Sequence, residues 1–509
     1  MLLIQETLSK VLHVDLSLRK FWIEERNDLF EKYLGGAGVA IHLLSEECKP
    51  SSKPLSPENP IIMAVGPLNG LFPIASKTVA MFKSPHTGTL GESHAGGRSS
   101  IAIRLAGYGA IVIKGANETP VYLAIHGEKV YFRDASVLWN MGNSYTVGRI
   151  IREREPGAGI RTIMRIGRAG EQLIPYASVV TETYRHFGRL GLGAVFGSKK
   201  LKAIMVLGKR SLKVGDQKLY RETYNEIFKA LTTSLSMKKY HELGTPMNVA
   251  SLNEMKALPS RNLAESSLKE SENVSGESFA KYLGRRTACS HCPVACIHLA
   301  ALREPYKAEP YFYKTRMISY DYELIYALGS MLGVTSPESI LKLIDELEKP
   351  GLDAMSAGVA LAWATEARQK GLISDVETHG LKLEWGDYTT YLKAIELLVE
   401  QPNPFYKALA QGVDYASSLY GGAEFALAFG GNEMPGYHTG PATYIGCLIG
   451  SRHSHLDGAG YSLDQKMLAS RTKPTPKAIV DELIAEEEWR QILSSLVICY
   501  VARTIYTPE

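Results

Sequence analysis

The chain has few cysteines, almost no excess charge and no long apolar run. Its 57 basic and 53 acidic residues leave a net charge of +4, whereas a dedicated nucleic-acid binder would show a concentrated basic face. No run of 18 apolar residues predicts a membrane span. The chain does not open on a basic stretch followed by an apolar one, as a secretory signal would. With 509 residues and six cysteines, we expect a cytoplasmic protein that buries large cores and needs no disulfides.

Half of these scarce cysteines stand together in a C-x2-C-x3-C pattern, at Cys289, Cys292 and Cys296. Clustered cysteines in a reducing compartment bind metal more often than they pair. Zinc sites usually combine two separated cysteine pairs, or cysteines with histidines. A triplet with one distant partner suits an iron–sulfur cluster better than zinc or buried structural thiols. The spacing leaves the fourth ligand open among the remaining cysteines, with Cys48 a weaker candidate than Cys447 or Cys499.

The spacing of apolar residues along the chain changes near residue 210. Before it, short β-branched segments separated by glycine and proline turns predict strands at residues 61–65, 110–114, 121–125 and 163–166. After residue 216, apolar residues recur at helical spacing and predict helices at residues 323–332, 336–347, 357–370 and 391–401. The pattern predicts a β domain followed by one or two helical domains.

Three further features have both a functional and an ordinary interpretation. The glycine-rich stretch 188–200 contains Arg189 and could bind an anion, but tight turns in a β-rich region explain it equally well. Glu323 heads an apolar helix, where it is either a general acid/base or a carboxylate favoured by the helix dipole. His453 and His455 could ligate a metal or lie in a surface loop.

Taken in order, the motifs resemble those of the tungsten-containing aldehyde:ferredoxin oxidoreductase family, over essentially the whole chain. The motifs are KSPHTG at 83–88, GESHAGG at 91–97, GRLGLGAVFGSKKLKAI at 188–204, the cysteine triplet, YE at 322–323 with ALGS at 327–330, PGLD at 350–353 and SLVIC at 495–499.

This resemblance implies a specific fold and cofactor set. It implies a tungsten or molybdenum atom held by the dithiolenes of two pterins, beside one [4Fe–4S] cluster, and it allows a magnesium ion between the pterin phosphates. It also implies an α+β fold. An N-terminal double β-sheet domain, residues 1–210, would lie under the pterins. Two mainly α-helical domains, residues 211–415 and 416–509, would cover them.

The resemblance also assigns site residues. The catalytic glutamate falls on Glu323, and the histidine beside the tungsten falls on His455, with His453 as the alternative. The cluster ligands would be Cys289, Cys292, Cys296 and Cys499. The cofactor contacts would be Lys77, His94, Gly96, His186, Phe187, Arg189, Glu348, Gly351, Leu352, Asp353, Leu456, Ser494 and Ile498.

The chain departs from the family at several of these positions. The motif Asp-x-x-Gly-Leu-Asp reads EKPGLD at 348–353, and Asp-x-x-Gly-Leu-Cys reads SSLVIC at 494–499. Lys77 replaces an arginine and loses bidentate phosphate geometry, while Ser494 removes a carboxylate. Relatives continue beyond the last cluster cysteine, whereas residues 507–509 resemble a helix start. We therefore expect a divergent, C-terminally short member.

The function implied is oxidation of aldehydes to carboxylic acids, with electrons leaving through the cluster to ferredoxin or a partner iron–sulfur subunit. One alternative is the same cofactor acting on a hydroxyacid, an oxoacid or an aromatic thioester. Another is a non-catalytic electron-transfer or scaffold subunit. By analogy with the family, we expect a small carbonyl substrate and a homodimer or hetero-oligomer, without nucleic acid.

Overall fold

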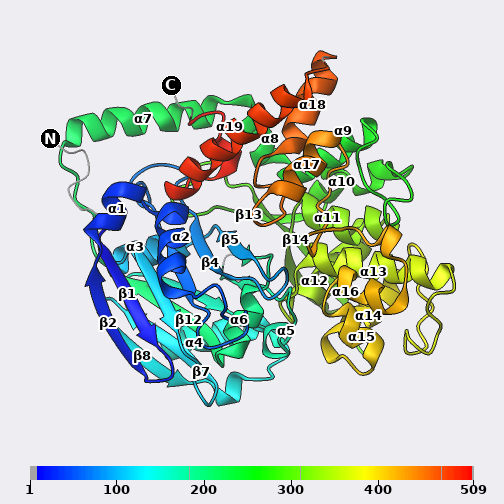
Figure 1. The fold of residues 1–509 in the computed structure, drawn as a ribbon, viewed down its shortest axis with the longest axis horizontal. Helices are drawn as coiled ribbons and strands as arrows, with labels where there is room; N and C mark the ends of the chain where they lie inside the picture. Colours follow the sequence, from blue (N-terminus) through cyan, green and yellow to red (C-terminus); the bar gives the residue numbers. More distant parts are fainter. Residues whose placement is uncertain (1–7, 183, 310, 472, 507–509) are drawn as a thin grey trace.

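Two six-stranded β-sheets form the N-terminal part of this computed structural model, which describes residues 8–182, 184–309, 311–471 and 473–506 (Figure 1). The predicted helix start at 507–509 lies outside the described residues. The strand orders are β2-β1-β6-β3-β4-β5 and β11-β10-β9-β12-β7-β8. The strands of the first sheet are β1 (Lys10–Asp15), β2 (Lys20–Glu25), β3 (Ile61–Ala64), β4 (Thr78–Lys83), β5 (Leu90–Ala95) and β6 (Ala110–Lys114). Those of the second are β7 (Val121–His126), β8 (Lys129–Asp134), β9 (Ile160–Arg165), β10 (Val179–Val180), β11 (His186–Phe187) and β12 (Leu201–Gly208).

The two sheets share one hydrophobic core. β1 pairs with β6, and β7 with β12, in parallel, and the other described pairs are antiparallel. Apolar side chains from both sheets join a single buried cluster. The helices of this part are α1 (Asn27–Tyr33), α2 (Gly36–Glu47), α3 (Ser99–Ala106), α4 (Ser144–Arg154), α5 (Arg168–Glu171) and α6 (Leu192–Ser198). The double β-sheet prediction is confirmed, and each of the four strand predictions falls on an observed strand.

The rest of the chain is mainly helical, as predicted, and in Figure 1 most of it lies beside the sheets. Ser336 caps α12 by accepting a hydrogen bond from the Ser339 N–H, and Pro337 occupies the first turn. The predicted helix at 323–332 is shorter, because the chain leaves α-helical geometry at Gly329. The helices are α7 (Gln217–Thr233), α8 (Leu235–Glu242), α9 (Asn248–Glu254), α10 (Gly276–Ala280), α11 (Tyr322–Leu328), α12 (Pro337–Glu348), α13 (Ala354–Gln369), α14 (Tyr388–Glu400), α15 (Pro404–Leu409), α16 (Val413–Tyr420), α17 (Pro441–Ile449), α18 (Gly460–Ser470) and α19 (Pro476–Ser495).

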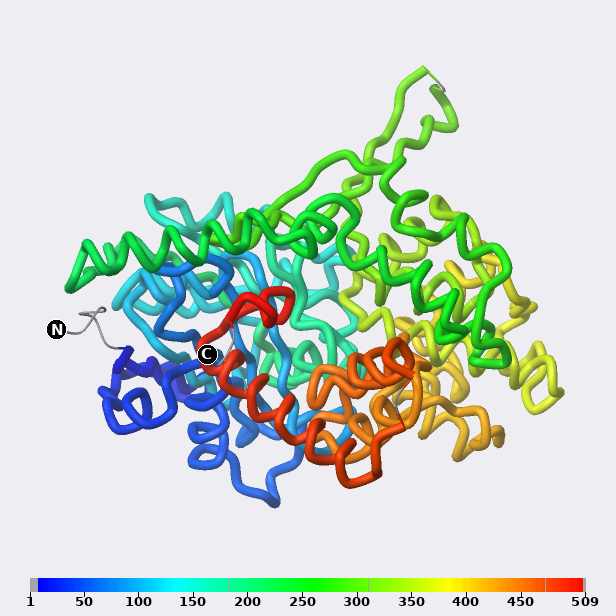
Figure 2. Tube along the Cα trace, turned by 90° about the horizontal axis from the view of Figure 1, so that it is seen from above, coloured from blue at the N-terminus to red at the C-terminus, as the bar shows by residue number. Residues whose placement is uncertain are grey.

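A three-stranded antiparallel sheet inside the helical part was not predicted. It consists of β13 (Leu283–Thr287), β14 (Ile297–Pro305) and β15 (Tyr313–Tyr320). The β14–β15 hairpin projects from the body in Figure 2. β14 contains Ala300, Ala301 and Leu302, which favour helices intrinsically, so local propensity gave no strand signal. A short pair, β16 (Ala428–Phe429) and β17 (Asn432–Glu433), completes the strands.

Within the described ranges, no single helix has the length and apolar character needed to cross a membrane, and the one helix pair that has them jointly, Tyr322–Leu332 with Pro337–Glu348, is bent by 111°.

Trp363 is the largest fully buried side chain of the helical core and provides a test of this packing. Its ring stacks on Phe425 at 6.5 Å, and its Nε1–H donates to the Gly422 carbonyl at 3.1 Å. We expect Trp363→Ala to lower the free energy of unfolding by about 3–5 kcal/mol, because it leaves a cavity. Leu372→Ala, at a side chain 42% exposed, should change it by about 0.5 kcal/mol or less. Urea denaturation of both variants makes the comparison, and equal losses would contradict the assigned core.

Candidate active site

The β13–β14 loop and the segment after α19 bring four cysteines together. Cys289, Cys292 and Cys296 lie in the loop, and Cys499 follows α19. Burial, followed by the charges of the other three thiols, raises the pKa of Cys292 to about 12. Burial and the charge of Cys499 likewise raise the pKa of Cys296, to about 11. The charges of these four thiols, here called the thiol cluster, therefore affect one another, and Cys292, Cys296 and Cys499 pack against the same hydrophobic cluster.

The backbone of Ile74 connects the two segments that carry the thiol cluster. Its N–H donates to the His291 carbonyl at 2.9 Å, and its carbonyl accepts from the Cys499 N–H at 3.2 Å. Gly96 closes the other side, where an added Cβ would lie 2.6 Å from the Cys289 sulfur. A side chain at position 96 would therefore displace that cysteine.

The four thiols of the thiol cluster can be compared with the ligand sets of zinc sites and iron–sulfur clusters. Among the residues that the structure describes, no three His, Cys, Asp or Glu side chains converge closely enough to hold a single metal ion. A structural zinc ion would need four donors converging at about 2.0–2.3 Å. Iron–sulfur clusters are held by four cysteine thiolates, so the donor set of the thiol cluster fits such a group.

Beyond the end of α12, the backbone of the chain bonds to the segment that precedes β10 of the second sheet. Gly351 adopts a left-handed conformation with φ +77°, which favours glycine. Leu352 then forms an isolated antiparallel bridge with Ala177, and the Asp353 N–H donates to the Tyr176 carbonyl at 3.0 Å. This arrangement belongs to the EKPGLD motif.

Beyond the end of α19, the SSLVIC motif repeats this arrangement on the other side of the site. Val497 has φ +57° at the position corresponding to Gly351. Ile498 forms an isolated antiparallel bridge with Ala75, and the Cys499 N–H donates to the Ile74 carbonyl. A β-branched residue in the left-handed region carries strain of the order of 1–2 kcal/mol. The second motif therefore keeps the backbone shape after losing the glycine and the carboxylate.

Two adjoining cavities lie between the sheets and the helical part. The larger has a volume of about 470 Å³, and the smaller about 190 Å³. The larger is lined by the predicted residues His94, Arg189, Glu323, His455 and Leu456. The smaller is lined by the predicted residues His186, Arg189, Glu323, Glu348, Leu352 and Asp353. Because Arg189 and Glu323 line both, the cavities meet at these two side chains.

Glu323 and His455 face each other at this junction. The Glu323 Oε1 lies 3.4 Å from the His455 Nε2, with side chains 21% and 8% exposed. Burial and then the charge of Asp321 raise the pKa of Glu323 to about 8. Burial, followed by the charges of Arg189 and other arginines, lowers the pKa of His455 well below its usual value. Glu323 is therefore a carboxyl that titrates near neutrality beside an uncharged imidazole.

His453 does not line either cavity. Its Nδ1 lies 3.1 Å from the Cys447 carbonyl, and its ring packs against Gly430. Of the two histidines left open by the sequence, His455 is the one beside Glu323.

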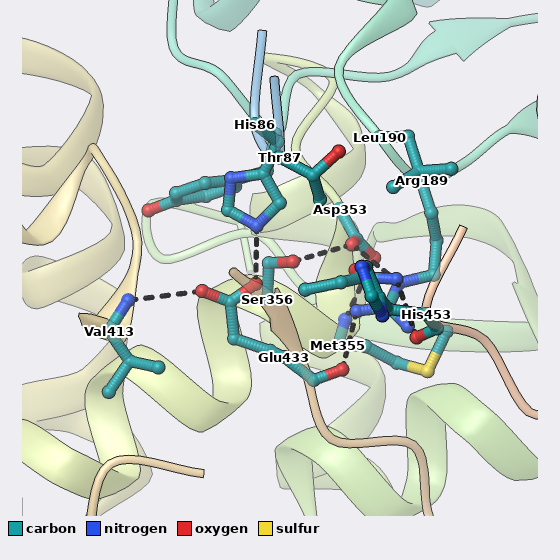
Figure 3. Close-up of polar contacts among 12 residues, drawn as sticks. His86, Thr87, Arg189, Leu190, Asp353, Met355, Ser356, Val413, Glu433 and His453 are labelled. Carbon is teal, nitrogen blue, oxygen red and sulfur yellow. Dashed lines mark hydrogen bonds and ion pairs between the residues drawn. The ribbon is translucent and has the colours of Figure 1, made fainter. Parts of the chain in front are cut away.

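Arg189 is held in position by contacts from both sides of the site (Figure 3). Its Nε donates to Asp353 at 3.1 Å, and its Nη2 donates to the Glu433 carbonyl at 2.7 Å. The Glu433 carboxylate in turn lies 2.7 Å from the His86 Nε2, and this pair is fully buried. Burial opposes ionisation of Glu433, but the charge of His86 outweighs it and lowers the pKa to about 2. Arg189 is therefore fixed while its Nη1 stays without a hydrogen-bond partner in the described chain.

The smaller cavity contains a second histidine–carboxyl pair. The His186 Nε2 lies 3.8 Å from the Glu348 Oε1, and the Glu348 Oε2 accepts from the Tyr145 hydroxyl at 2.5 Å. Burial raises the pKa of Glu348 to about 8. Burial and the charge of Arg185 lower the pKa of His186 to about 3. Both groups are therefore mostly uncharged at neutral pH and suit a neutral hydrogen-bonding ligand.

The larger cavity has a charged wall that the sequence reasoning missed. The Arg452 Nη1 lies 3.1 Å from Glu92, its Nε binds Asp457, and Glu92 also bonds the His94 Nε2 at 2.5 Å. Burial opposes ionisation of Glu92, but Arg452 and His94 outweigh it and lower its pKa to about 2. Glu92 lies inside the GESHAGG motif and Arg452 directly precedes His453, but no local signal pairs residues so far apart. Arg185, which lines both cavities, had no sequence signal either.

The remaining predicted residues occupy three kinds of position. Phe187 and Ile498 are buried in hydrophobic clusters, so only their backbone is available to a cofactor. The Ser494 hydroxyl is 2.6 Å from the Tyr500 hydroxyl, so it does not replace the missing carboxylate. Lys77 lies near Gly96, with its Nζ 3.6 Å from where a Cβ at Gly96 would be. Its charge partly offsets the rise that burial causes in the pKa of Cys296.

Unpaired buried atoms give a direct test of whether the cavities suit a polar cofactor. Each lacks a hydrogen-bond partner among the described residues, although buried polar groups are usually paired. On the residues that line the two cavities they are the Ser178 Oγ, His186 Nε2, Arg189 Nη1, Glu323 Oε1, Glu348 Oε1, Asn432 Oδ1, Arg452 Nη2 and His455 Nδ1. Their number and convergence on the two cavities fit a large polar ligand that supplies the missing partners.

Comparison with known proteins agrees with this architecture. Residues 11–208 match the family described as "Aldehyde ferredoxin oxidoreductase, N-terminal domain", and residues 222–509 match its domains 2 and 3. The tungsten-containing aldehyde ferredoxin oxidoreductase of Thermococcus kodakarensis is 33% identical over 499 residues, covering 96% of this chain and 80% of the relative. The Pyrococcus furiosus protein of the same name is 32% identical with the same coverage. The chain belongs to the aldehyde ferredoxin oxidoreductase family, an enzyme family, as the sequence motifs predicted.

Two further similarities come from proteins with other names. The WOR-like subunit of a Pyrococcus furiosus aliphatic sulfonate oxidoreductase is 32% identical over 429 residues, or 81% of this chain and 66% of that one. A chain of the BamBC active-site complex of benzoyl coenzyme A reductase, solved with 1,5-dienoyl-CoA, superposes with a TM-score of 0.79. It is 23% identical and the match covers 97% of this chain and 81% of that chain, so it supports the fold alone.

The buried ion-pair wall predicts a large effect of removing its arginine. Arg452→Met leaves Glu92 and Asp457 buried without their cation, so we expect the free energy of unfolding to fall by about 3–5 kcal/mol. Lys466→Met breaks the exposed pair with Glu482 and should cost about 1 kcal/mol or less. Urea denaturation of both variants tests this, and a neutral Arg452→Met would show that the wall is not formed.

Proposed function

We propose that this protein is a tungsten- or molybdenum-dependent bis-pterin oxidoreductase that oxidises aldehydes to carboxylic acids. The observation that carries the proposal is the Glu323–His455 pair at the junction of the two cavities. The names of the relatives, tungsten-containing aldehyde ferredoxin oxidoreductases, support the same cofactor and substrate class.

The cofactor would be held on two sides. Toward the thiol cluster, the contacts would come from Lys77, His94 and Gly96, and from the backbone at Ile498. Around the smaller cavity, the unpaired atoms of His186, Arg189 and Glu348 offer partners. When bound, the tungstopterin would accept the two electrons of the reaction, and a [4Fe–4S] cluster on the thiol cluster would release them singly. A magnesium ion between the pterin phosphates is part of the same proposal.

The residues at the junction supply proton transfer and orientation. An aldehyde and water give a carboxylic acid, two protons and two electrons. Glu323, with a pKa of about 8, would accept a proton from the adding oxygen, since a base works best when its pKa is near the working pH. His455, uncharged at neutral pH, would donate a hydrogen bond to the substrate oxygen as negative charge develops.

A second candidate uses the same cofactor on an anionic substrate, such as an oxoacid or a thioester that carries phosphates. Four arginines, Arg185, Arg189, Arg452 and Arg503, line the larger cavity, and guanidinium groups bind carboxylates and phosphates well. The relative that is named for an aliphatic sulfonate adds weight to this alternative. Comparing turnover with an aldehyde and with the matching oxoacid separates the two.

Replacing the proposed base tests its role. Glu323→Gln keeps the shape but cannot accept a proton, so aldehyde-dependent viologen reduction should fall about 10²–10⁴-fold with tungsten and iron contents unchanged. In the wild-type enzyme the rate should rise with pH toward 8 as the Glu323 carboxyl ionises. This rise of the rate with pH should disappear in the variant. Glu338→Gln, on an exposed part of α12, is the control. Undiminished activity of Glu323→Gln would exclude this role.

The cluster assignment is tested with two cysteines of the C-terminal part. Cys499→Ser removes one sulfur of the thiol cluster and should lower the iron content and the visible absorbance of the iron–sulfur cluster, because a ligand of the cluster is lost. Cys447→Ser changes a buried cysteine of α17 and should keep the iron. Iron analysis after anaerobic purification decides, and the opposite pattern would assign the fourth ligand to Cys447.

A further inference from the structure

A third hollow, of about 310 Å³, opens beside the thiol cluster and shares no lining residue with the two cavities. Three separate segments of the β domain and the cysteine loop contribute to it. Its lining consists of Arg98, Arg152, Gly159, Ile160, Arg161 and Ser290. Half of these residues are arginines and none is acidic, so the hollow is electropositive.

The arginines of the hollow are poorly neutralised. Arg98 and Arg152 are exposed. Arg161 donates to the backbone carbonyl of Glu155, but its Nε is buried and has no hydrogen-bond partner among the described residues. Burial and then the charge of Arg152 lower the pKa of Arg161, and the charge of Glu155 offsets this only in part, so the two guanidinium groups repel each other. An anion in the hollow would relieve this repulsion.

The hollow is also directly attached to the thiol cluster. Ser290, between Cys289 and Cys292, uses both its N–H and its hydroxyl to bind the Gly97 carbonyl, at 2.9 and 3.0 Å. Gly96 packs against the Cys289 sulfur, and Arg98 follows Gly97. His291, the next residue of the loop, is exposed, so this is where the thiol cluster approaches the surface.

We propose that the hollow formed by Arg98, Arg152, Arg161 and Ser290 is the docking surface for a small acidic electron-carrier protein. The inference rests on the proposed function, because it gives the partner that collects electrons from the cluster. Each aldehyde oxidation releases two electrons, so two carrier molecules would each be reduced by one. Carboxylates on the carrier suit the guanidinium groups, and opposite charges would steer its association and orient it at the cysteine loop.

The test is a charge reversal at the two exposed arginines, assayed with an acidic [4Fe–4S] ferredoxin as the probe. In R98E/R152E we expect the KM for ferredoxin to rise at least about tenfold, and its dependence on salt to flatten. Viologen reduction with aldehyde should stay within about twofold, because a small dye needs no docking surface. Direct binding of ferredoxin to the enzyme without aldehyde, measured by calorimetry, should weaken by the same factor.

Lys382→Glu is the matched control, because it reverses an exposed charge in the loop between α13 and α14. It should leave ferredoxin binding unchanged, and an effect equal to that of R98E/R152E would overturn the proposal. So would unaltered ferredoxin binding in R98E/R152E, or a hollow that binds inorganic phosphate tightly but not ferredoxin. If the wild-type protein binds ferredoxin through the hollow but oxidises no aldehyde, the docking surface stands and the proposed function fails.

Discussion

The site depends on two backbone bridges that fasten the chain beyond a helix end to the β domain. One bridge joins Leu352 to Ala177, and the other joins Ile498 to Ala75. Hydrogen bonds of this kind need no particular side chain, so the second bridge survives although its motif has lost both the glycine and the carboxylate. It is the bridge that returns Cys499 to the cysteine loop, which lies some 200 positions earlier in the sequence.

Burial of charge is the second constraint on the site. Where a buried carboxylate has a cationic partner, as Glu92 has Arg452, its pKa falls to about 2 and it stays charged. Where the partner is missing, as at Glu323 and Glu348, the pKa rises to about 8. The paired groups join the sheets to the helical part, and Glu92 with Arg452 also lines the larger cavity, whereas the unpaired Glu323 and Glu348 line the cavities without a cation. Perturbed carboxyls of the second kind mark functional sites more often than structural ones.

The sequence predicted the parts of this arrangement that have a local signal. Clustered cysteines, β-branched strands and the helix at residues 336–347 all follow from spacing and propensity, and the family resemblance supplied the double sheet and Glu323. The β13–β15 sheet was missed because β14 contains strong helix formers. The contacts of Arg452 were missed because they join residues that are distant in the sequence, and only the folded chain distinguishes His455 from His453.

Metal analysis of the anaerobically purified protein is the most direct measurement of the central claim. The account predicts about four irons per chain, together with about one tungsten or molybdenum. About one zinc per chain with neither iron nor tungsten would contradict it, because the four thiols would then serve a structural ion and the cavities would have no redox cofactor.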